Sequence, residues 1–292
     1  MSRGGTPAAT FGGFDSIHDA LLALPGARVL DVRDERAFAL GHPPEAGRLS
    51  LAEFETRRPE LPSRETAVLV VHDEPALARV AAEHLAARGY ACIAWLARSL
   101  AAEPSGRASR AAAERLWSPS EFIEREAARA LEARAKPGSP RALDLACGSG
   151  RGAVFLALSG WRAEGWDADG SALELARAFA RRQRVDVPFL EHDLESAEPP
   201  VPERAFDLIV VVRYLHRPLF PWIERALAPG GVLLYETFRD GQQRFGTPKQ
   251  ERFLLRDGEL TTAFPSLVVE RHEQTPDGTP PLLARLVARK LR

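Results

Sequence analysis

A glycine-rich loop that follows an aspartate is the part of this sequence whose residue types and spacing best suit chemistry. Asp144 lies near the end of a short apolar run, and Gly148 and Gly150 lead from it into a helical stretch at 153–158. Glycines at such a junction let the backbone approach a ligand closely and present helix N-terminal amides to it. A dinucleotide would place its pyrophosphate here, where the Asp144 carboxylate would repel it. The pattern therefore favours a ligand that has an amino group and no phosphate.

Two further acids follow at the ends of the next two predicted strands. Asp167 lies 23 residues after Asp144, and an acid at about this spacing can accept hydrogen bonds from both hydroxyls of a ribose. Asp193 follows the third strand, where its carboxylate can accept from an adenine amino group. An ammonium, a sulfonium, a ribose and an adenine together describe S-adenosylmethionine. We predict this cofactor, no metal, and the following binding residues: Asp144, Ala146, Cys147, Gly148, Gly150, Asp167, Ala168, Asp193 and Leu194.

The region from Trp117 to Arg292 resembles the class I S-adenosylmethionine-dependent methyltransferases, through the segments 144–150, 166–167 and 192–193. The resemblance implies a seven-stranded Rossmann-like sheet in the order 3-2-1-4-5-7-6, with strand 7 antiparallel. Ala146 stands where the first glycine of the loop often lies. Alanine is tolerated there if its φ is negative, and this is what we expect. We expect Cys147 to pack rather than to act as a nucleophile.

The fourth predicted strand, 206–212, leads into a cationic and aromatic segment at the carboxyl edge of the sheet, where open α/β sheets bind ligands. The segments 214–218, 235–238 and 253–255 resemble the tellurite-resistance methyltransferases and their thiopurine-methyltransferase-like neighbours. This resemblance implies a small, soft or anionic methyl acceptor: a chalcogen oxyanion such as tellurite or selenite, or a thiol. The catalytic candidates are Arg213, Tyr214 and His216, and the candidates for binding an anionic acceptor are Arg213, Arg217 and Arg244.

A general base is not required by this chemistry. His216 is a candidate base, but its place between Leu215 and Arg217 equally suits a structural role. Methyl transfer is a direct displacement, and proximity and orientation alone can lower such a barrier by roughly 7–11 kcal/mol. A soft anionic acceptor needs no deprotonation. We therefore expect no obligatory catalytic base.

The segment 30–46 resembles the rhodanese domain, which carries sulfane sulfur on a cysteine, and the resemblance extends over about 15–100. In that family the catalytic cysteine follows the strand equivalent to 68–71. Here the loop runs from His72 to Ala76 without a cysteine, and Asp73 most nearly takes the position of the thiol. Acidic side chains would repel the anionic persulfide that such a loop holds. We expect this domain to be catalytically silent and to act as a scaffold, a homodimer contact or a docking module.

Alternating strand and helix patterns surround both sets of residues and predict two α/β domains. The second is expected to have strands at 141–145, 162–166, 187–191, 206–212 and 231–237, followed by an antiparallel pair at 267–273 and 282–289. A stretch without apolar periodicity separates the two patterns. The predicted organisation is a flexible N-terminus over 1–14, a rhodanese-like domain over 15–102, a linker over 103–116 and a methyltransferase domain over 117–292.

Composition limits the other classes of function. Lys and Arg (39) balance Asp and Glu (40), which disfavours nucleic acid as a partner. Two cysteines suit a reducing cytoplasm, and the sequence has neither a signal-peptide core nor the roughly 18 apolar residues of a membrane helix. We expect a cytoplasmic protein without a membrane partner. A methyltransferase acting on a docked macromolecule, a nicotinamide-dependent oxidoreductase and a non-enzymatic regulatory protein remain as alternatives.

Overall fold

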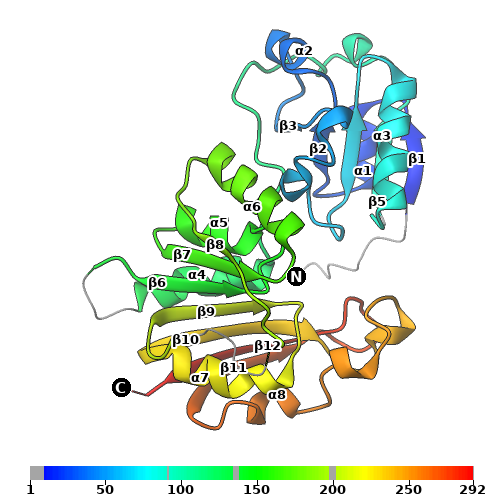
Figure 1. Ribbon diagram of the computed structural model, residues 1–292. Coiled ribbons are helices and arrows are strands. Elements are labelled where there is room, and N and C mark those ends of the chain that lie inside the picture. Colours follow the sequence, from blue (N-terminus) through cyan, green and yellow to red (C-terminus); the bar gives the residue numbers. More distant parts are fainter. Residues whose placement is uncertain (1–9, 91, 134–137, 197–201, 292) are drawn as a thin grey trace. The chain divides into compact units, whose positions relative to one another are not determined.

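The computed structural model describes residues 10–90, 92–133, 138–196 and 202–291, and the chain divides into two compact units, 1–118 and 119–292. The first unit contains a five-stranded parallel sheet in the order β1-β5-β4-β2-β3 (Figure 1). Its elements are β1 (Thr10–Phe14), α1 (Ile17–Ala23), β2 (Arg28–Asp31), α2 (Glu35–Leu40), β3 (Ala46–Arg48), β4 (Val68–Val71), α3 (Pro75–Ala87) and β5 (Cys92–Leu96), with short 3-10 turns at Leu51–Glu53, Arg58–Glu60 and Leu100–Ala102.

Side chains of the first sheet alternate between two separate apolar clusters. Leu30 and Val70 pack in one cluster with the buried face of α3, whereas Val29 and Leu69 pack in the other with α1 and α2. Successive residues of a strand point to opposite faces, so helices cover both faces of this sheet. Such covering is typical of parallel sheets, because both of their faces are apolar.

The expectation of a flexible segment over 1–14 is wrong for residues 10–14. These residues form β1, which pairs with β5 in parallel from Thr10–Cys92 to Phe14–Leu96. The sequence Thr-Phe-Gly-Gly-Phe has too few side chains to show an apolar alternation. Gly13 allows a close approach, since a Cβ there would lie 3.0 Å from Nε1 of Trp95. Residues 1–9 lie outside the described part of the chain.

The segment 103–116, expected to be a linker, is bonded to the first unit. His42 and Ser109 exchange backbone hydrogen bonds of 3.0 Å, and the amide of Glu114 donates to the carbonyl of Ala46 at 3.1 Å. Leu116 is buried in the same apolar cluster as α3. The segment lacks periodicity because it lies extended across existing elements instead of forming one of its own.

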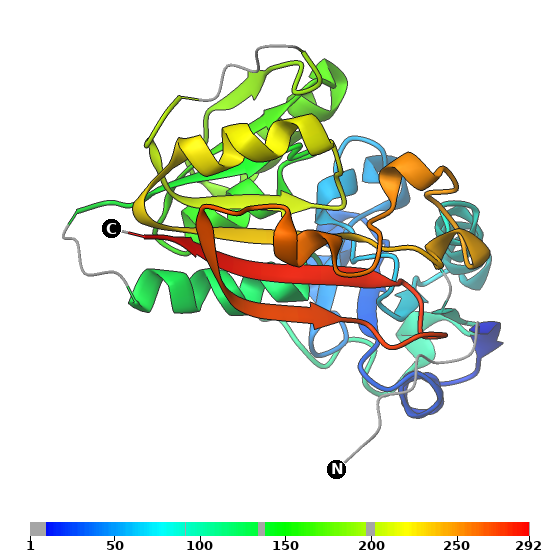
Figure 2. The same ribbon diagram turned by 90° about the horizontal axis from the view of Figure 1, so that it is seen from below.

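The second unit contains a seven-stranded sheet in the order β8-β7-β6-β9-β10-β12-β11, in which β12 is antiparallel to both of its neighbours. Counted from β6 as strand 1, this order is 3-2-1-4-5-7-6. Figure 2 shows β12 between β10 and β11. Its elements are α4 (Glu121–Glu132), β6 (Arg141–Leu145), α5 (Arg151–Leu158), β7 (Arg162–Asp167), α6 (Gly170–Gln183), β8 (Phe189–Glu191), β9 (Phe206–Val212), α7 (Phe220–Ala226), β10 (Leu227–Phe238), α8 (Glu259–Thr262), β11 (Leu267–Gln274) and β12 (Leu283–Lys290).

The central strands of this sheet send alternate residues to different layers. Leu143 of β6 and Ile209 of β9 belong to one apolar cluster with Ile223 of α7 and Leu260 of α8. Asp144 points the other way, toward the start of α5. Because β6, β7, β8 and β9 run parallel, their carboxyl ends meet at one edge, and this edge carries the predicted site. None of the helices in the described residues is long and apolar enough to cross a membrane.

Candidate functional site

The loop between β6 and α5 turns through three left-handed residues. Ala146, Gly148 and Gly150 have φ values of +55°, +51° and +83°. The expectation of a negative φ at Ala146 is therefore wrong. The turn is held from outside, because the amide of Cys147 donates to the carbonyl of Trp166 on β7 at 3.0 Å. A side chain in this conformation costs roughly 1–2 kcal/mol, which the surrounding hydrogen bonds must offset.

The glycines of the loop differ in what surrounds them. A Cβ on Gly148 would meet nothing within 4 Å, so this side of the loop faces open space that a ligand can occupy. A Cβ on Gly150 would lie 2.8 Å from Ala176, and one on Gly152 would lie 2.5 Å from Oδ2 of Asp144. Gly152 was not among the predicted site residues, and its signal was the third glycine of Gly148-Ser149-Gly150-Arg151-Gly152. It allows the Asp144 carboxylate to reach α5.

Asp144 is buried against the first turn of α5. Asp144 is only 4% exposed, and its Oδ2 accepts a hydrogen bond of 2.8 Å from the amide of Ala153. Burial raises the pKa of Asp144 to about 7, the nearby Asp167 carboxylate raises it too, and the bond from Ala153 opposes both effects. This carboxyl group is thus poised to ionise when a cation binds beside it.

Asp167 joins the end of β7 to the glycine loop. Oδ2 accepts from the amide of Gly148 at 2.7 Å, and Oδ1 accepts from the amide of Asp169 at 2.9 Å. A carboxylate oxygen can accept two hydrogen bonds, so each oxygen keeps capacity for a ribose hydroxyl. Ala168, the neighbouring predicted residue, is exposed. The carboxylate is therefore fixed in orientation while it can still bind a ligand.

The third acid, Asp193, begins a tight turn after β8. Its Oδ1 accepts from the amide of Glu195 at 2.9 Å, and the side chain is exposed. Leu194 is buried in the apolar cluster beneath the sheet edge. The turn places a carboxylate and an apolar side chain next to each other, an arrangement that suits the polar edge and the flat face of an adenine.

Cys147 is not an activated thiol. Burial raises the pKa of Cys147, and the negative charges of Asp144 and Asp167 raise it further. A neutral thiol is a weak nucleophile, so the expectation that Cys147 packs agrees with its surroundings.

Tyr214 carries an unused donor beside these acids. Its hydroxyl is buried and has no hydrogen-bond partner within the described residues. Burial raises the pKa of Tyr214, and the carboxylates of Glu195, Asp193 and Asp167 raise it as well, so the phenol stays protonated. A buried hydroxyl without a partner costs about 1–3 kcal/mol, and a ligand that accepts its proton would remove that cost.

Arg213, which precedes Tyr214, lies at the carboxyl end of β9 with φ +56°. Its amide donates to the carbonyl of Glu236 at 2.7 Å, and its guanidinium lies over the ring of Phe238, with Cζ 5.8 Å from the ring centre. The side chain is exposed at the rim of the sheet. It therefore remains near the site, held by the aromatic ring.

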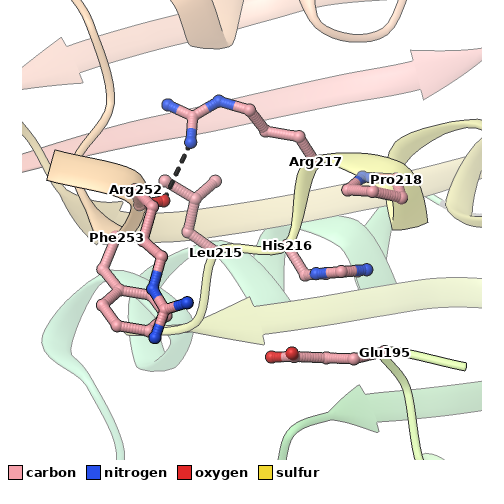
Figure 3. Close-up of a pocket in the computed structure, with 7 residues that line it drawn as sticks. All are labelled: Glu195, Leu215, His216, Arg217, Pro218, Arg252 and Phe253. Atoms are coloured by element: carbon pink, nitrogen blue, oxygen red, sulfur yellow. Dashed lines mark hydrogen bonds between the residues drawn. The ribbon is translucent and has the colours of Figure 1, made fainter. Parts of the chain in front are cut away.

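A cavity of about 290 Å³ opens beside His216 (Figure 3). It is lined by Glu195, Leu215, His216, Arg217, Pro218, Arg252 and Phe253. A second cavity, of about 330 Å³, shares Glu195, His216 and Pro218 with the first and extends along Leu194 to Trp222. The structure thus places two predicted residues at neighbouring cavities: His216 lines both of them, and Leu194 lines the second. Sequence reasoning missed Glu195 and Arg252, whose positions depend on loop conformation, and it named Phe253 only as part of the segment 253–255.

Arg217 is occupied with internal bonds. Its guanidinium pairs with the carboxylate of Glu259, and it donates to the carbonyls of Arg252 and Leu254, both at 2.9 Å. In Figure 3 this side chain points away from His216 and Glu195. These bonds argue against the predicted contact between Arg217 and an acceptor. Arg244 is exposed on the 3-10 turn Gln242–Arg244 and lines neither cavity.

In the first unit, the loop after β4 contains an ion-paired carboxylate. Asp73 accepts from Nη1 of Arg33 at 3.3 Å and from Nη2 of Arg107 at 3.2 Å. Arg33 is buried and also binds Asp31. Cys92 is buried at the start of β5. In the described residues no group of His, Cys, Asp and Glu side chains could hold a metal ion.

This chain is similar to several known proteins. Residues 142–231 match the model of a family described as a methyltransferase domain. The ribosomal protein L11 methyltransferase of Thermus thermophilus is 42% identical over 112 residues, which cover 38% of this chain and 42% of that protein. Among solved structures, TehB from Haemophilus influenzae is similar with 18% identity and a TM-score of 0.44, over 56% of this chain and 61% of that chain. YcgJ from Bacillus subtilis is similar with 20% identity and a TM-score of 0.48, over 60% of this chain and all of that chain.

The second unit therefore contains a segment, 142–231, that is similar to methyltransferase domains, and S-adenosylmethionine is the cofactor that such a domain implies. The chain spans 42% of the length of the curated relative that it matches. The residues present fit the cofactor on observations of this structure: Gly148 faces open space, Asp167 keeps hydrogen-bonding capacity, and Tyr214 has a buried hydroxyl without a partner.

Proposed function

We propose that this protein transfers the methyl group of S-adenosylmethionine to a small-molecule acceptor. The observation that carries the proposal is the placement of Asp144, Asp167 and Asp193 at the ends of neighbouring parallel strands, with Asp167 bonded to the amide of Gly148, whose other side is open. This pattern of charge suits a ligand with a cationic end and a ribose, and it opposes a pyrophosphate. It therefore favours a methyltransferase over the nicotinamide-dependent alternative.

The chain's own residues bind and orient. Asp167 would accept from the ribose hydroxyls, Asp193 from the adenine amino group, and Asp144 would face the ammonium end of the cofactor. When bound, S-adenosylmethionine would supply an electrophilic methyl group on its sulfonium, and its thioether would leave with the electron pair of the broken C–S bond. Placement of the acceptor in line with that bond is the main requirement.

The cavity beside His216 is the best place for the acceptor. Its volume of about 290 Å³ is at the lower end of the range for small-molecule sites, roughly 300–1,000 Å³. A thiol or a chalcogen oxyanion such as tellurite or selenite would fit, and neither needs a catalytic base once it is ionised. His216 lines the cavity, and a His216→Ala variant that retains turnover would support a mechanism without an obligatory base.

A protein acceptor is the second candidate function. The relative from Thermus thermophilus is named for methylation of ribosomal protein L11, and its matched segment is 42% identical to this chain. We propose that the first unit is a rhodanese-like domain without its thiol. If the acceptor is a protein, this unit serves as a docking or dimerisation module. The position expected for the thiol supports the loss of sulfur transfer, because it holds Asp73, whose carboxylate pairs with Arg33 and Arg107 and has no sulfur to carry a persulfide. Clear turnover of thiosulfate and cyanide would contradict this loss.

Calorimetric titration with S-adenosylmethionine tests the central proposal. The wild-type protein should bind, and Asp167→Ala should weaken binding by tenfold or more, because two hydrogen bonds to a charged group are removed. Asp186→Ala is the matched control, since Asp186 is an exposed acid of the same unit. Absence of binding to the wild type would refute the proposal. A screen of thiols, selenite, tellurite and purified L11 then separates the acceptor classes.

A further inference from the structure

The cavity beside His216 presents one carboxylate and one guanidinium that form no ion pair with another residue that the structure describes. The side chains of Glu195 and Arg252 both line it, and neither forms an ion pair or a side-chain hydrogen bond with another described residue. The Arg252 guanidinium lies over the ring of Phe253, with Cζ 4.6 Å from the ring centre. Figure 3 shows Glu195 and Arg252 on the walls of the same cavity. The site therefore offers opposite charges at two separate points.

Arg217 holds this wall in place without adding to its charge. Its bonds to the carbonyls of Arg252 and Leu254 bracket Phe253, and its own charge is neutralised by Glu259. The loop that carries Arg252 is thus tied to the segment that carries His216. Stacking on Phe253 further limits where the Arg252 guanidinium can lie. The Arg252 guanidinium is consequently restricted in position at the wall of the cavity, although the side chain itself is exposed.

We infer that the acceptor is a small zwitterion whose carboxylate is bound by Arg252 and whose ammonium is bound by Glu195. The inference rests on the proposed function and specifies its substrate class. A guanidinium can bind a carboxylate through two parallel hydrogen bonds. A bare oxyanion would be attracted by Arg252 but repelled by Glu195, and a simple amine would meet the reverse. Only a molecule with both charges satisfies both side chains, and a volume of about 290 Å³ suits one of amino-acid size.

Three thiols of similar size test the two charged contacts one at a time. L-cysteine has both groups, cysteamine has only the ammonium, and 3-mercaptopropionate has only the carboxylate. Each is titrated calorimetrically into the full-length protein in the presence of S-adenosylhomocysteine, so that binding is measured without turnover. Selenite is titrated in parallel. L-cysteine should bind at least fivefold more tightly than either single-charge thiol and than selenite.

Two charge-removing variants then assign each contact. Arg252→Gln should weaken binding of L-cysteine and 3-mercaptopropionate by about five- to tenfold, and it should leave cysteamine binding equal or tighter, because this arginine repels an ammonium. Glu195→Gln should weaken binding of L-cysteine and cysteamine by a similar factor, and it should leave 3-mercaptopropionate binding equal or tighter, because this carboxylate repels an anion. Arg244→Gln is the control for loss of an exposed arginine, and it should change none of them. Folding of each variant is checked by circular dichroism.

The outcomes distinguish the acceptor class from the methyltransferase function. Failure of S-adenosylhomocysteine to bind would overturn the proposed function, and each titration is therefore repeated without it to test the cavity alone. Equal affinity for the three thiols, tighter binding of selenite, lack of any binding, or variants that lower all affinities equally would each overturn the zwitterion inference while cofactor binding is intact.

Discussion

The unpartnered hydroxyl of Tyr214 leads to a prediction in which stability and binding change in opposite directions. The chain has three tyrosines, and the hydroxyls of the other two donate to carbonyls: Tyr90 to Pro62 at 2.7 Å and Tyr235 to Tyr214 at 3.0 Å. Only the Tyr214 hydroxyl is buried with no partner among the described residues. Its removal in Tyr214→Phe deletes a desolvated group and breaks no bond within the protein.

The magnitudes follow from this difference. A buried polar group without a partner costs about 1–3 kcal/mol, so Tyr214→Phe should leave the unfolding free energy of the ligand-free protein unchanged or raise it by up to about 1 kcal/mol. Tyr235→Phe breaks a buried bond and should lower that free energy by about 1–2 kcal/mol. If the Tyr214 hydroxyl donates to bound S-adenosylmethionine, its loss should weaken binding by about fivefold, which corresponds to about 1 kcal/mol.

Urea unfolding and calorimetry measure the two effects separately. Both variants lie in the second unit, so any transition of the first unit provides an internal reference for each. A Tyr214→Phe protein that is less stable than wild type by more than about 1 kcal/mol would mean that the hydroxyl has a partner in the free protein. An unchanged dissociation constant for S-adenosylmethionine would mean that the hydroxyl does not face the cofactor. Either result refutes the reasoning.

Other parts of the site give four further predictions. Ala146→Gly should raise the unfolding free energy by up to about 1 kcal/mol in urea titrations, because relief of a left-handed alanine exceeds the added entropy of glycine. Gly152→Ala should lower it by about 1–3 kcal/mol and weaken cofactor binding in calorimetry, since the new methyl group would meet the Asp144 carboxylate. Because the pKa of Asp144 is raised to about 7, the folded state binds more protons than the unfolded state between about pH 4 and 7. The unfolding free energy of the wild type should therefore fall with rising pH in that window, while the affinity for the cofactor rises. Asp144→Asn should remove both trends. Arg217→Lys should raise the acceptor KM and leave the cofactor dissociation constant unchanged, because lysine cannot reproduce the paired bonds to Glu259.

The parts of this fold that depend on local pattern could be predicted from sequence. The strand predicted at 141–145 is β6, Arg141–Leu145, because an apolar run bounded by a proline and a glycine loop leaves little freedom at either end. The three acids could likewise be placed at strand ends by counting. Strand β8 is shorter than the predicted 187–191, since its pairing with β7 begins only at Phe189. Pairing partners decide such ends, and a single sequence does not contain them.

What could not be predicted depends on contacts between distant residues. Arg217 binds Glu259, which lies 42 residues further along the chain, so its sequence neighbours gave no sign that its charge was already neutralised. Glu195 and Arg252 come together only because two loops meet beside His216. Cys147 was expected to pack, and the structure gives the physical reason why its thiol is unreactive: burial beside two carboxylates raises its pKa.

The backbone at the carboxyl edge of the sheet stores strain next to the site it forms. Ala146 and Arg213 follow the neighbouring strands β6 and β9, and both have positive φ. Each is held by a bond to a strand on its outer side: the amide of Cys147 reaches the carbonyl of Trp166, and the amide of Arg213 reaches that of Glu236. At roughly 1–2 kcal/mol for each residue, the two turns are tolerated because flanking strands fix them. Strain of this kind turns the chain sharply out of both strands, and the residues that follow, Gly148 and Tyr214, are those with open space or an unpaired donor. The edge is therefore shaped for a ligand at a cost in stability, which is why Ala146→Gly should stabilise the protein without improving its affinity for the cofactor.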